Sequence, residues 1–233
     1  MTHESKTRPR RGSSRSPPAR TAASDSAATA AGLKRDAASL GVTLSDADAA
    51  RLCTLVEELS RWNRRYNLTA VRAGADTLTH HVLDSLAVHP DLAGNRIADV
   101  GTGAGFPGLP LAVCNPQRQF TLIDSTAKKI RFVSHAARLL GLDNVTALQA
   151  RVEALQPQAP FDTVVARAFA PLPRMLSQVG ALCGARTQVL AMKGKRPDSE
   201  LAALPAGWRV ISERSLAIPG LAAQRCLIAL ARA

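Results

Sequence analysis

Aromatic side chains are scarce in this chain of 233 residues, since Phe, Trp and Tyr together make up only 3% of it. This scarcity argues against modules that read RNA by stacking bases on an aromatic sheet. Runs of about 18 apolar residues, the length that a membrane-spanning helix needs, are also missing, so we expect no membrane span. Aliphatic side chains must fill the core, and an apolar fraction of 46% is enough to form one.

Cysteine is scarce and follows no motif. No C-x-x-C pair occurs, and the four thiols stand far apart among apolar neighbours: Cys53, Cys114, Cys183 and Cys226. The sequence therefore predicts neither a disulfide framework nor a metal site. Buried free thiols are typical of a reducing compartment, so we expect a cytoplasmic protein.

Acidic residues are outnumbered, with 18 Asp and Glu against 30 Lys and Arg and a net charge of +12. Such a balance favours a polyanionic partner. The charge is concentrated near the N-terminus, where residues 1–35 carry eight basic and two acidic side chains. Residues 1–31 lack aromatic and branched aliphatic side chains, which predicts a disordered basic tail that adds affinity for RNA. An organelle transit peptide is the alternative interpretation.

Residues 32–90 are predicted to form a helical N-terminal extension. Ser45 and Asp48 resemble a capping box at the start of a helix, and Asn67 is expected to end it. Apolar residues recur at helical spacing between these points: Leu52, Leu55, Val56, Leu59 and Trp62. A second helix is expected over about 75–87.

Residues 91–233 are predicted to form one α/β domain. The strand candidates are 96–100, 119–123, 145–149, 162–166, 187–192, 208–217 and 224–231, and the helix candidates are 107–114, 127–141 and 171–183. Strands that alternate with helices predict a parallel sheet with right-handed crossovers. The last two strands follow each other directly and predict an antiparallel hairpin that turns at Pro219 and Gly220. A seven-stranded, mostly parallel sheet that ends in a hairpin has the shape of the Rossmann-like class I methyltransferases.

The segment from Asp99 to Gly108, DVGTGAGFPG, follows a strand and opens a helix. Gly103 and Gly105 fit both the dinucleotide pattern G-x-G-x-x-G and the pattern D-x-G-x-G-x-G, which resembles the first motif of S-adenosyl-L-methionine (AdoMet) methyltransferases. We favour AdoMet, because its cationic amino-acid end suits the acid Asp99. A P-loop is excluded, since no G-K-[S/T] follows.

Three more loops at strand ends carry candidate cofactor ligands. Asp124 ends the second strand, where an acid binds ribose hydroxyls or caps the next helix. Val152 and Glu153 follow the third strand and either cover an adenine or form a solvated loop. Arg167 follows the fourth strand and either faces the site or forms a structural ion pair.

Seven strings occur in order along the chain: WNRRYNLTAVR, HHVLDSLA, ADVGTGAGFPGLPLA, LIDSTAKKIRFV, RVEAL, VARAFAPLPRML and LAMKG. Together they resemble the RsmG/GidB family, which methylates a guanine N7 in 16S ribosomal RNA. The resemblance runs from about residue 40 to the C-terminus and implies a class I fold with AdoMet as methyl donor. It also implies cofactor contacts at matching positions, which are Gly101, Phe106, Val152, Glu153 and Arg167.

The implied reaction needs little from the protein, because guanine N7 has a lone pair and no proton. No general base is required, and we assign no catalytic residue. RNA contacts are expected from basic side chains near the strand ends: Lys128, Lys129, Lys193 and Lys195. His81, Asp84 and Ser85 share one helix face and either shape the pocket or form a buried hydrogen-bond network. We expect a monomer that acts on 16S RNA or the small ribosomal subunit.

Three other functions are compatible with parts of the sequence. The chain could methylate a small molecule or another RNA with the same cofactor. It could be an NAD-dependent oxidoreductase, since the glycine pattern is shared. A non-catalytic RNA-binding protein with a relic loop is the third alternative, and the intact loop from Asp99 to Gly105 argues against it.

Overall fold

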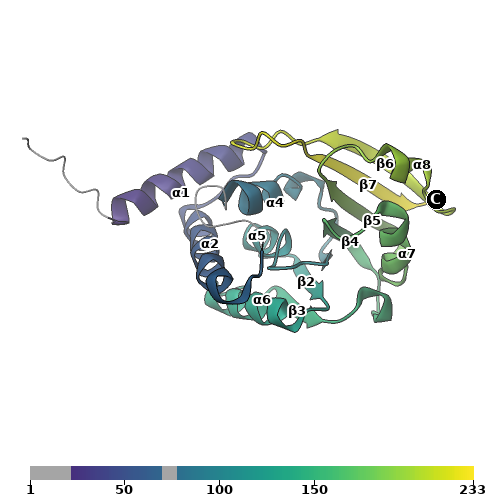
Figure 1. Cartoon of the computed structure of the whole chain (residues 1–233), viewed down its shortest axis with the longest axis horizontal. Coiled ribbons are helices and arrows are strands. Elements are labelled where there is room, and N and C mark those ends of the chain that lie inside the picture. The colour runs from purple at the N-terminus through teal and green to yellow at the C-terminus, as the bar shows by residue number, and fades with distance from the viewer. Residues whose placement is uncertain (1–21, 70–77) are drawn as a thin grey trace, which may run out of the picture.

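A computed structural model describes residues 22–69 and 78–233 (Figure 1). Its centre is a seven-stranded sheet with the order β3-β2-β1-β4-β5-β7-β6. The strands are β1 Arg96–Val100, β2 Gln119–Asp124, β3 Val145–Gln149, β4 Phe161–Arg167, β5 Cys183–Lys193, β6 Trp208–Ser215 and β7 Cys226–Arg232. The pairs from β3 to β5 are parallel, whereas β7 runs antiparallel to β5 and β6. The predicted sheet and its terminal hairpin are confirmed.

Helices cover both faces of the sheet. They are α5 Gly108–Val113, α6 Ala127–Leu139, α7 Leu172–Val179 and the short α8 Asp198–Ala202, with single 3-10 turns at Val152–Ala154 and Gly180–Leu182. One apolar cluster packs α5 and α6 on the sheet, and a second packs α7 on the other face. The sequence did not predict α8, which has only five residues. None of the helices within the described ranges is both long enough and apolar enough to span a bilayer.

The N-terminal helices are α1 Ala22–Ser39 and α2 Asp46–Tyr66. The predicted capping box is present at the start of α2, and Asn67 ends the helix in a left-handed conformation with φ +47°. The helix expected over 75–87 begins outside the described residues. Its described part is a π-helical segment, Leu78–Leu83, that continues into α4 Asp84–Leu86 and is followed by a 3-10 turn, His89–Asp91. The inward side chains of α2 share one cluster with α5 and α6, so the extension and the sheet domain have a common core.

The predicted tail over residues 1–31 is too long, because α1 begins at Ala22. This stretch is rich in alanine, the residue with the highest helix propensity. Leu33 and Ala37, further along the same helix, are buried in the core and anchor it. Residues 1–21 lie outside the described ranges, and for them the prediction of a basic tail stays a prediction.

Candidate cofactor and substrate site

The glycine loop connects β1 to α5 and contains residues that adopt positive φ. Gly101 has φ +68°, and a Cβ there would lie 2.4 Å from Cδ2 of Phe169. Gly103 has φ +61°, but the nearest atom to its added Cβ would be the carbonyl oxygen of Gly101 at 3.9 Å. The loop therefore needs glycine at the first position for both backbone and space, and at the second for the backbone alone.

Asp99 lies beneath this loop and is fully buried. Its Oδ2 accepts hydrogen bonds from the Thr102 hydroxyl at 2.6 Å and the Gly108 N–H at 2.7 Å. Its Oδ1 has no partner within the described residues. Burial raises the pKa of Asp99 to about 6, although both hydrogen bonds act in the opposite direction. These two hydrogen bonds hold the loop in place. Asp99 is not among the residues that line the two cavities beside the loop, and its predicted contact with the cofactor stays a prediction.

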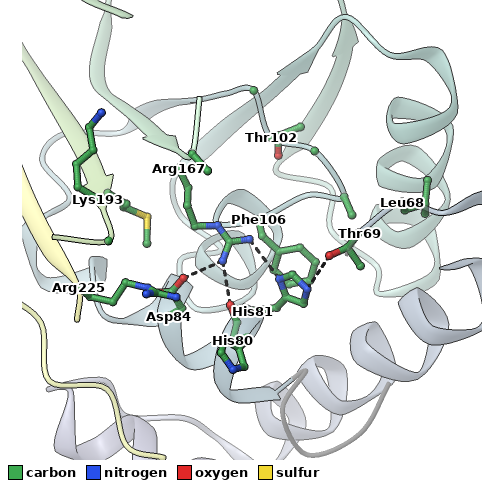
Figure 2. Close-up of a pocket in the computed structure, with 16 residues that line it drawn as sticks. Leu68, Thr69, His80, His81, Asp84, Thr102, Phe106, Arg167, Lys193 and Arg225 are labelled. Carbon is green, nitrogen blue, oxygen red and sulfur yellow. Dashed lines mark hydrogen bonds and ion pairs between the residues drawn. The ribbon is translucent and has the colours of Figure 1, made fainter. Parts of the chain in front are cut away.

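Two cavities adjoin the glycine loop and share Gly101 and Ala168 in their walls. The smaller has a volume of about 300 Å³ and the larger, shown in Figure 2, about 550 Å³. Both are open clefts at the carboxyl ends of the parallel strands, where ligands bind in such sheets. Besides Gly101, the predicted residues in the wall of the smaller cavity are Asp124, Lys129, Val152 and Glu153. The larger contains Gly103, Phe106, Arg167 and Lys193.

In the smaller cavity, Asp124 is held by the backbone around it. Its Oδ2 accepts the Gly103 N–H at 3.0 Å, and its Oδ1 accepts the Thr126 N–H at 2.8 Å at the start of α6. The Lys129 ammonium lies 3.6 Å from Oδ2. The N-cap residue of α6 is Thr126, so the alternative that Asp124 caps the helix is wrong; its carboxylate holds the N–H of the N-cap residue and lines the cavity. Each oxygen keeps a lone pair for a ligand hydroxyl.

Gln178 on α7 also lines this cavity, although no pattern in the sequence indicates it. Its amide nitrogen lies 3.4 Å from Oε1 of Glu153. Its own Oε1 is buried and has no partner within the described residues. A buried acceptor without a donor is costly, so this oxygen is suited to a donor on a ligand.

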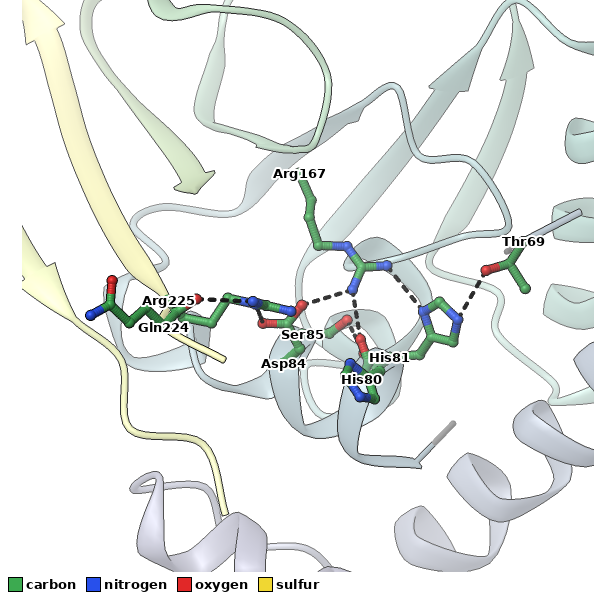
Figure 3. Close-up of polar contacts among 8 residues, drawn as sticks. All are labelled: Thr69, His80, His81, Asp84, Ser85, Arg167, Gln224 and Arg225. Atoms are coloured by element: carbon green, nitrogen blue, oxygen red, sulfur yellow. Dashed lines mark hydrogen bonds and ion pairs between the residues drawn. The ribbon is translucent and has the colours of Figure 1, made fainter. Parts of the chain in front are cut away.

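The larger cavity is built on an ionic network around Asp84 (Figure 3). Its carboxylate is 2% exposed and accepts hydrogen bonds from Arg167 at 3.0 Å and from Arg225 at 3.0 Å. Arg167 also donates to the carbonyl oxygen of His80 at 3.1 Å and contacts Nδ1 of His81 at 3.3 Å. Both interpretations of Arg167 therefore apply, because it forms a structural ion pair and lines the cavity.

His81 is a buried member of the same network. Because a guanidinium only donates hydrogen bonds, Nδ1 of His81 is the acceptor, and Nε2 carries the hydrogen toward Thr69 Oγ1 at 3.2 Å. The imidazole stacks on Phe106, with ring centroids 4.7 Å apart. The pKa of His81 is lowered to about 4, mainly by burial and to a smaller extent by the positive charge of Arg167. His81 is thus neutral at neutral pH, and it shapes the pocket as part of a hydrogen-bond network.

The four predicted RNA-contacting lysines have different surroundings. Lys129 is paired with Asp124, and Lys193 is paired with Glu200 at 2.7 Å. Lys128 is exposed and donates to the carbonyl oxygen of Tyr66 at 3.0 Å. Lys195 is exposed and lines another cavity, of about 680 Å³, which shares Arg225 with the larger cavity beside the glycine loop. In the part of the chain that the structure covers, no cluster of His, Cys, Asp and Glu could hold a metal ion.

Solved structures share the fold. A SAM-dependent methyltransferase from Aquifex aeolicus matches with a TM-score of 0.51 and 17% identity, over 76% of this chain and 97% of that chain. A ribosomal protein L11 methylase from Lactobacillus delbrueckii subsp. bulgaricus matches with a TM-score of 0.50 and 17% identity, over 69% of this chain and 80% of that one. These likenesses confirm the class I methyltransferase fold and, at such identities, show the fold alone.

Closer relatives are found among curated proteins. The ribosomal RNA small subunit methyltransferase G of Saccharophagus degradans is 45% identical over 201 residues, which cover 86% of this chain and 90% of that protein. The protein of the same name from Azoarcus sp. is 47% identical over 196 residues, or 84% and 92% of the two chains. The family model GidB, described as rRNA small subunit methyltransferase G, matches residues 48–228, which run from the first turn of α2 into β7. On these matches the chain belongs to the GidB family.

Proposed function

We propose that this chain transfers the methyl group of AdoMet to N7 of a guanine in 16S ribosomal RNA. One observation carries the proposal: two cavities meet at Gly101, at the carboxyl ends of the parallel strands, in a member of the GidB family. The relatives named above are methyltransferases of small-subunit ribosomal RNA, which supports that substrate class. The guanine N7 specificity rests on the family resemblance in the sequence.

The smaller cavity suits the adenosine part of AdoMet. Asp124 retains lone pairs that can accept hydrogen bonds from ribose hydroxyls. An adenine amino group can donate a hydrogen bond to Gln178 Oε1, which is buried without a donor. Val152 and Glu153 complete this wall. When bound, AdoMet supplies an activated methyl group on a sulfonium sulfur. Gly101 lines both cavities, so the methionine part would pass over it toward the larger cavity.

The larger cavity suits the target guanine, and its methylation at N7 requires no general base. Because guanine N7 has no proton to lose, the protein has to orient the nucleotide and keep the cavity rigid. Asp84 fixes the position of the Arg167 guanidinium, and the neutral His81 packs on Phe106 and holds its ring. Polar groups that are fixed in this way need no reorganisation during the reaction. No catalytic residue is assigned, in agreement with the chemistry.

The remaining parts of the proposal concern partners and location. We propose that Lys128 and Lys195 contact RNA phosphates, since both are exposed, while Lys129 and Lys193 form the cavity walls. A monomer in the cytoplasm, acting on RNA or on the small subunit, is the proposed working state. The four cysteines are free thiols, as such a location favours.

The decisive experiment incubates the protein with labelled AdoMet and unmethylated small subunits and maps the labelled base by mass spectrometry. Label on guanine N7 is expected, and Gly101→Asp should abolish both AdoMet binding and labelling. Gly207→Asp is the matched control, because Gly207 has φ +81° and no atom within 4 Å of an added Cβ. Label on another base or on a small molecule would contradict guanine N7 as the target and identify a different substrate. An absence of AdoMet binding by the unaltered chain would overturn the proposal.

A further inference from the structure

Four basic side chains gather where the end of α2 meets the start of α6. Arg64 and Arg65 lie in the last turn of α2, and Lys128 and Arg131 lie in the first two turns of α6. All four are exposed. Figure 1 shows α2 and α6 side by side. We call this surface, formed by Arg64, Arg65, Lys128 and Arg131, the basic seam.

Contacts between the two helices fix the geometry of the seam. The Lys128 ammonium donates to the carbonyl oxygen of Tyr66 at 3.0 Å. Two turns further along α6, Nε2 of His135 lies 2.9 Å from Oε1 of Glu58. Arg131 is three residues after Lys128 and four before His135, so it shares the helix face that meets α2. These contacts fix the two helices relative to each other, so the four basic residues project from a rigid backbone.

The seam keeps its positive charge because nearby acids are already engaged. Glu58 binds Arg61, Trp62 and His135. Asp124, near the start of α6, binds Lys129 and two backbone N–H groups. Across residues 22–69 and 78–233, no seam residue forms an ion pair with an acid. Four uncompensated cations on one surface favour a polyanion.

The seam also lies beside the candidate site. The chain runs from Tyr66 through Asn67 to Leu68 and Thr69, which line the larger cavity. Lys129, the neighbour of Lys128, lines the smaller cavity. A chain of nucleotides that inserts one base into the larger cavity would therefore pass close to the seam.

An aromatic ring accompanies these cations. Tyr66 is 39% exposed, and the guanidinium carbon of Arg65 lies 5.5 Å from the centre of its ring. The Tyr66 ring also packs on Trp62, with ring centroids 5.3 Å apart. A supported aromatic face among basic side chains is the combination that binds unpaired nucleotides, by stacking and by phosphate contacts.

We propose that the basic seam binds the phosphate backbone of the RNA segment that flanks the methylated nucleotide, and that Tyr66 stacks on an unpaired base of this segment. The inference rests on the proposed function, since it takes RNA as the substrate. It assigns RNA contacts to the N-terminal extension, for which the sequence predicted helices and no contact with RNA. The extension would thus be part of the substrate surface as well as of the core.

The test compares the full-length chain with Arg64→Glu/Arg65→Glu in binding to unmethylated 16S RNA at several salt concentrations. Loss of two phosphate contacts should lower the slope of log affinity against log salt by about 1.5. The KM for RNA should rise by tenfold or more at low salt. Unchanged AdoMet affinity shows that the variant is folded. If it is reduced, Arg64→Gln/Arg65→Gln removes the charge without reversing it, and the same lower slope is expected.

The matched control is Arg186→Glu/Arg209→Glu, which changes the net charge by the same amount. Arg186 and Arg209 are exposed and lie near the amino-terminal ends of β5 and β6, away from both cavities. The control should keep the salt slope and KM of the unaltered chain. Equal slopes for the seam variant and the control would overturn the proposal. Because RNA binding is measured without turnover, a failure of methylation alone tests the proposed function and not the seam.

Stacking by Tyr66 is tested separately by Tyr66→Leu. The backbone carbonyl that holds Lys128 is retained, so the seam keeps its charge and the salt slope should not change. The affinity for RNA should fall by about tenfold, the usual effect of losing one stacked base. An affinity equal to that of the unaltered chain would remove Tyr66 from the interface.

Discussion

At the scale of single residues, the glycine loop gives the sharpest prediction. Gly101→Ala combines a positive φ with a steric clash against Phe169, so it should destabilise the protein by about 2–4 kcal/mol. Gly103→Ala carries only the backbone penalty, about 1 kcal/mol. Urea unfolding measures both. Adding Phe169→Ala should relieve Gly101→Ala in part, and strictly additive effects would contradict the clash.

Asp99 gives a prediction about pH. Its ordinary pKa is 3.8, and burial raises the pKa of Asp99 to about 6 in the folded protein. Between these values the folded state binds more protons than the unfolded state, so this carboxyl lowers stability as pH rises from 4 to 6. Asp99→Asn removes that loss. Its free energy of unfolding relative to the unaltered chain should therefore increase by about 3 kcal/mol as the pH rises from 4 to 6. Unfolding at a series of pH values tests this.

His81 titrates over the same range with the opposite sign. The pKa of His81 is lowered to about 4, so the unfolded state binds the extra proton and stability falls as pH drops below 6.5. The unaltered chain and Asp99→Asn both contain His81, so its contribution cancels in the difference between their free energies of unfolding. A difference that stays constant from pH 4 to 6 would show that Asp99 is ionised normally.

The sequence located some site residues and missed others for physical reasons. Asp124 was located because a strand end fixes where its last residue lies in a parallel sheet. Asp99 was placed at the right strand tip, but the pattern does not show that the loop folds over it. Arg225 reaches Asp84 across 141 positions of the chain, and no local signal reports such a pairing.

At the scale of elements, the capping box of α2 gives a prediction with an internal control. Ser45 Oγ accepts the Asp48 N–H at 3.1 Å, so Ser45→Ala should destabilise the protein by about 1 kcal/mol. Ser60 lies inside the same helix and only donates to the carbonyl oxygen of Val56. Ser60→Ala should therefore cost little. Equal losses in urea unfolding would contradict the capping role.

Periodicity located the strands because most of them are short apolar runs bounded by turn residues. It missed the first residues of β5, which begins at Cys183, inside the helix expected over 171–183. It was less informative for the segment Leu78–Leu83, where a π-helix replaces the expected α-helix. Apolar spacing does not distinguish the two helices over so few residues. The first turns of α1 were missed for a related reason, since alanines and small polar residues form no apolar stripe.

At the scale of the whole molecule, the N-terminal extension and the sheet share one hydrophobic core, so we expect them to fold as one unit. Leu52 and Leu55 of α2 are completely buried in the same cluster as Leu109 and Phe132. A chain that begins at residue 91 would expose this apolar surface. We therefore expect residues 91–233 alone to aggregate or to unfold without a cooperative transition, as measured by calorimetry.

The position of α1 also determines where the basic tail can be removed. Residues 1–21 carry six basic side chains and one acidic side chain, and a cut after Thr21 leaves α1 intact. Removing them should lower the affinity for RNA at low salt and reduce the salt slope, since each phosphate contact contributes about 0.7 to that slope for single strands. AdoMet affinity and stability should not change. A full-length chain whose six basic tail residues are replaced by Gln separates charge from length, and it should lose the same affinity. If both altered chains bind RNA as tightly as the unaltered chain at low salt, the tail contributes nothing to binding, and the RNA-binding charge belongs to the folded part of the molecule.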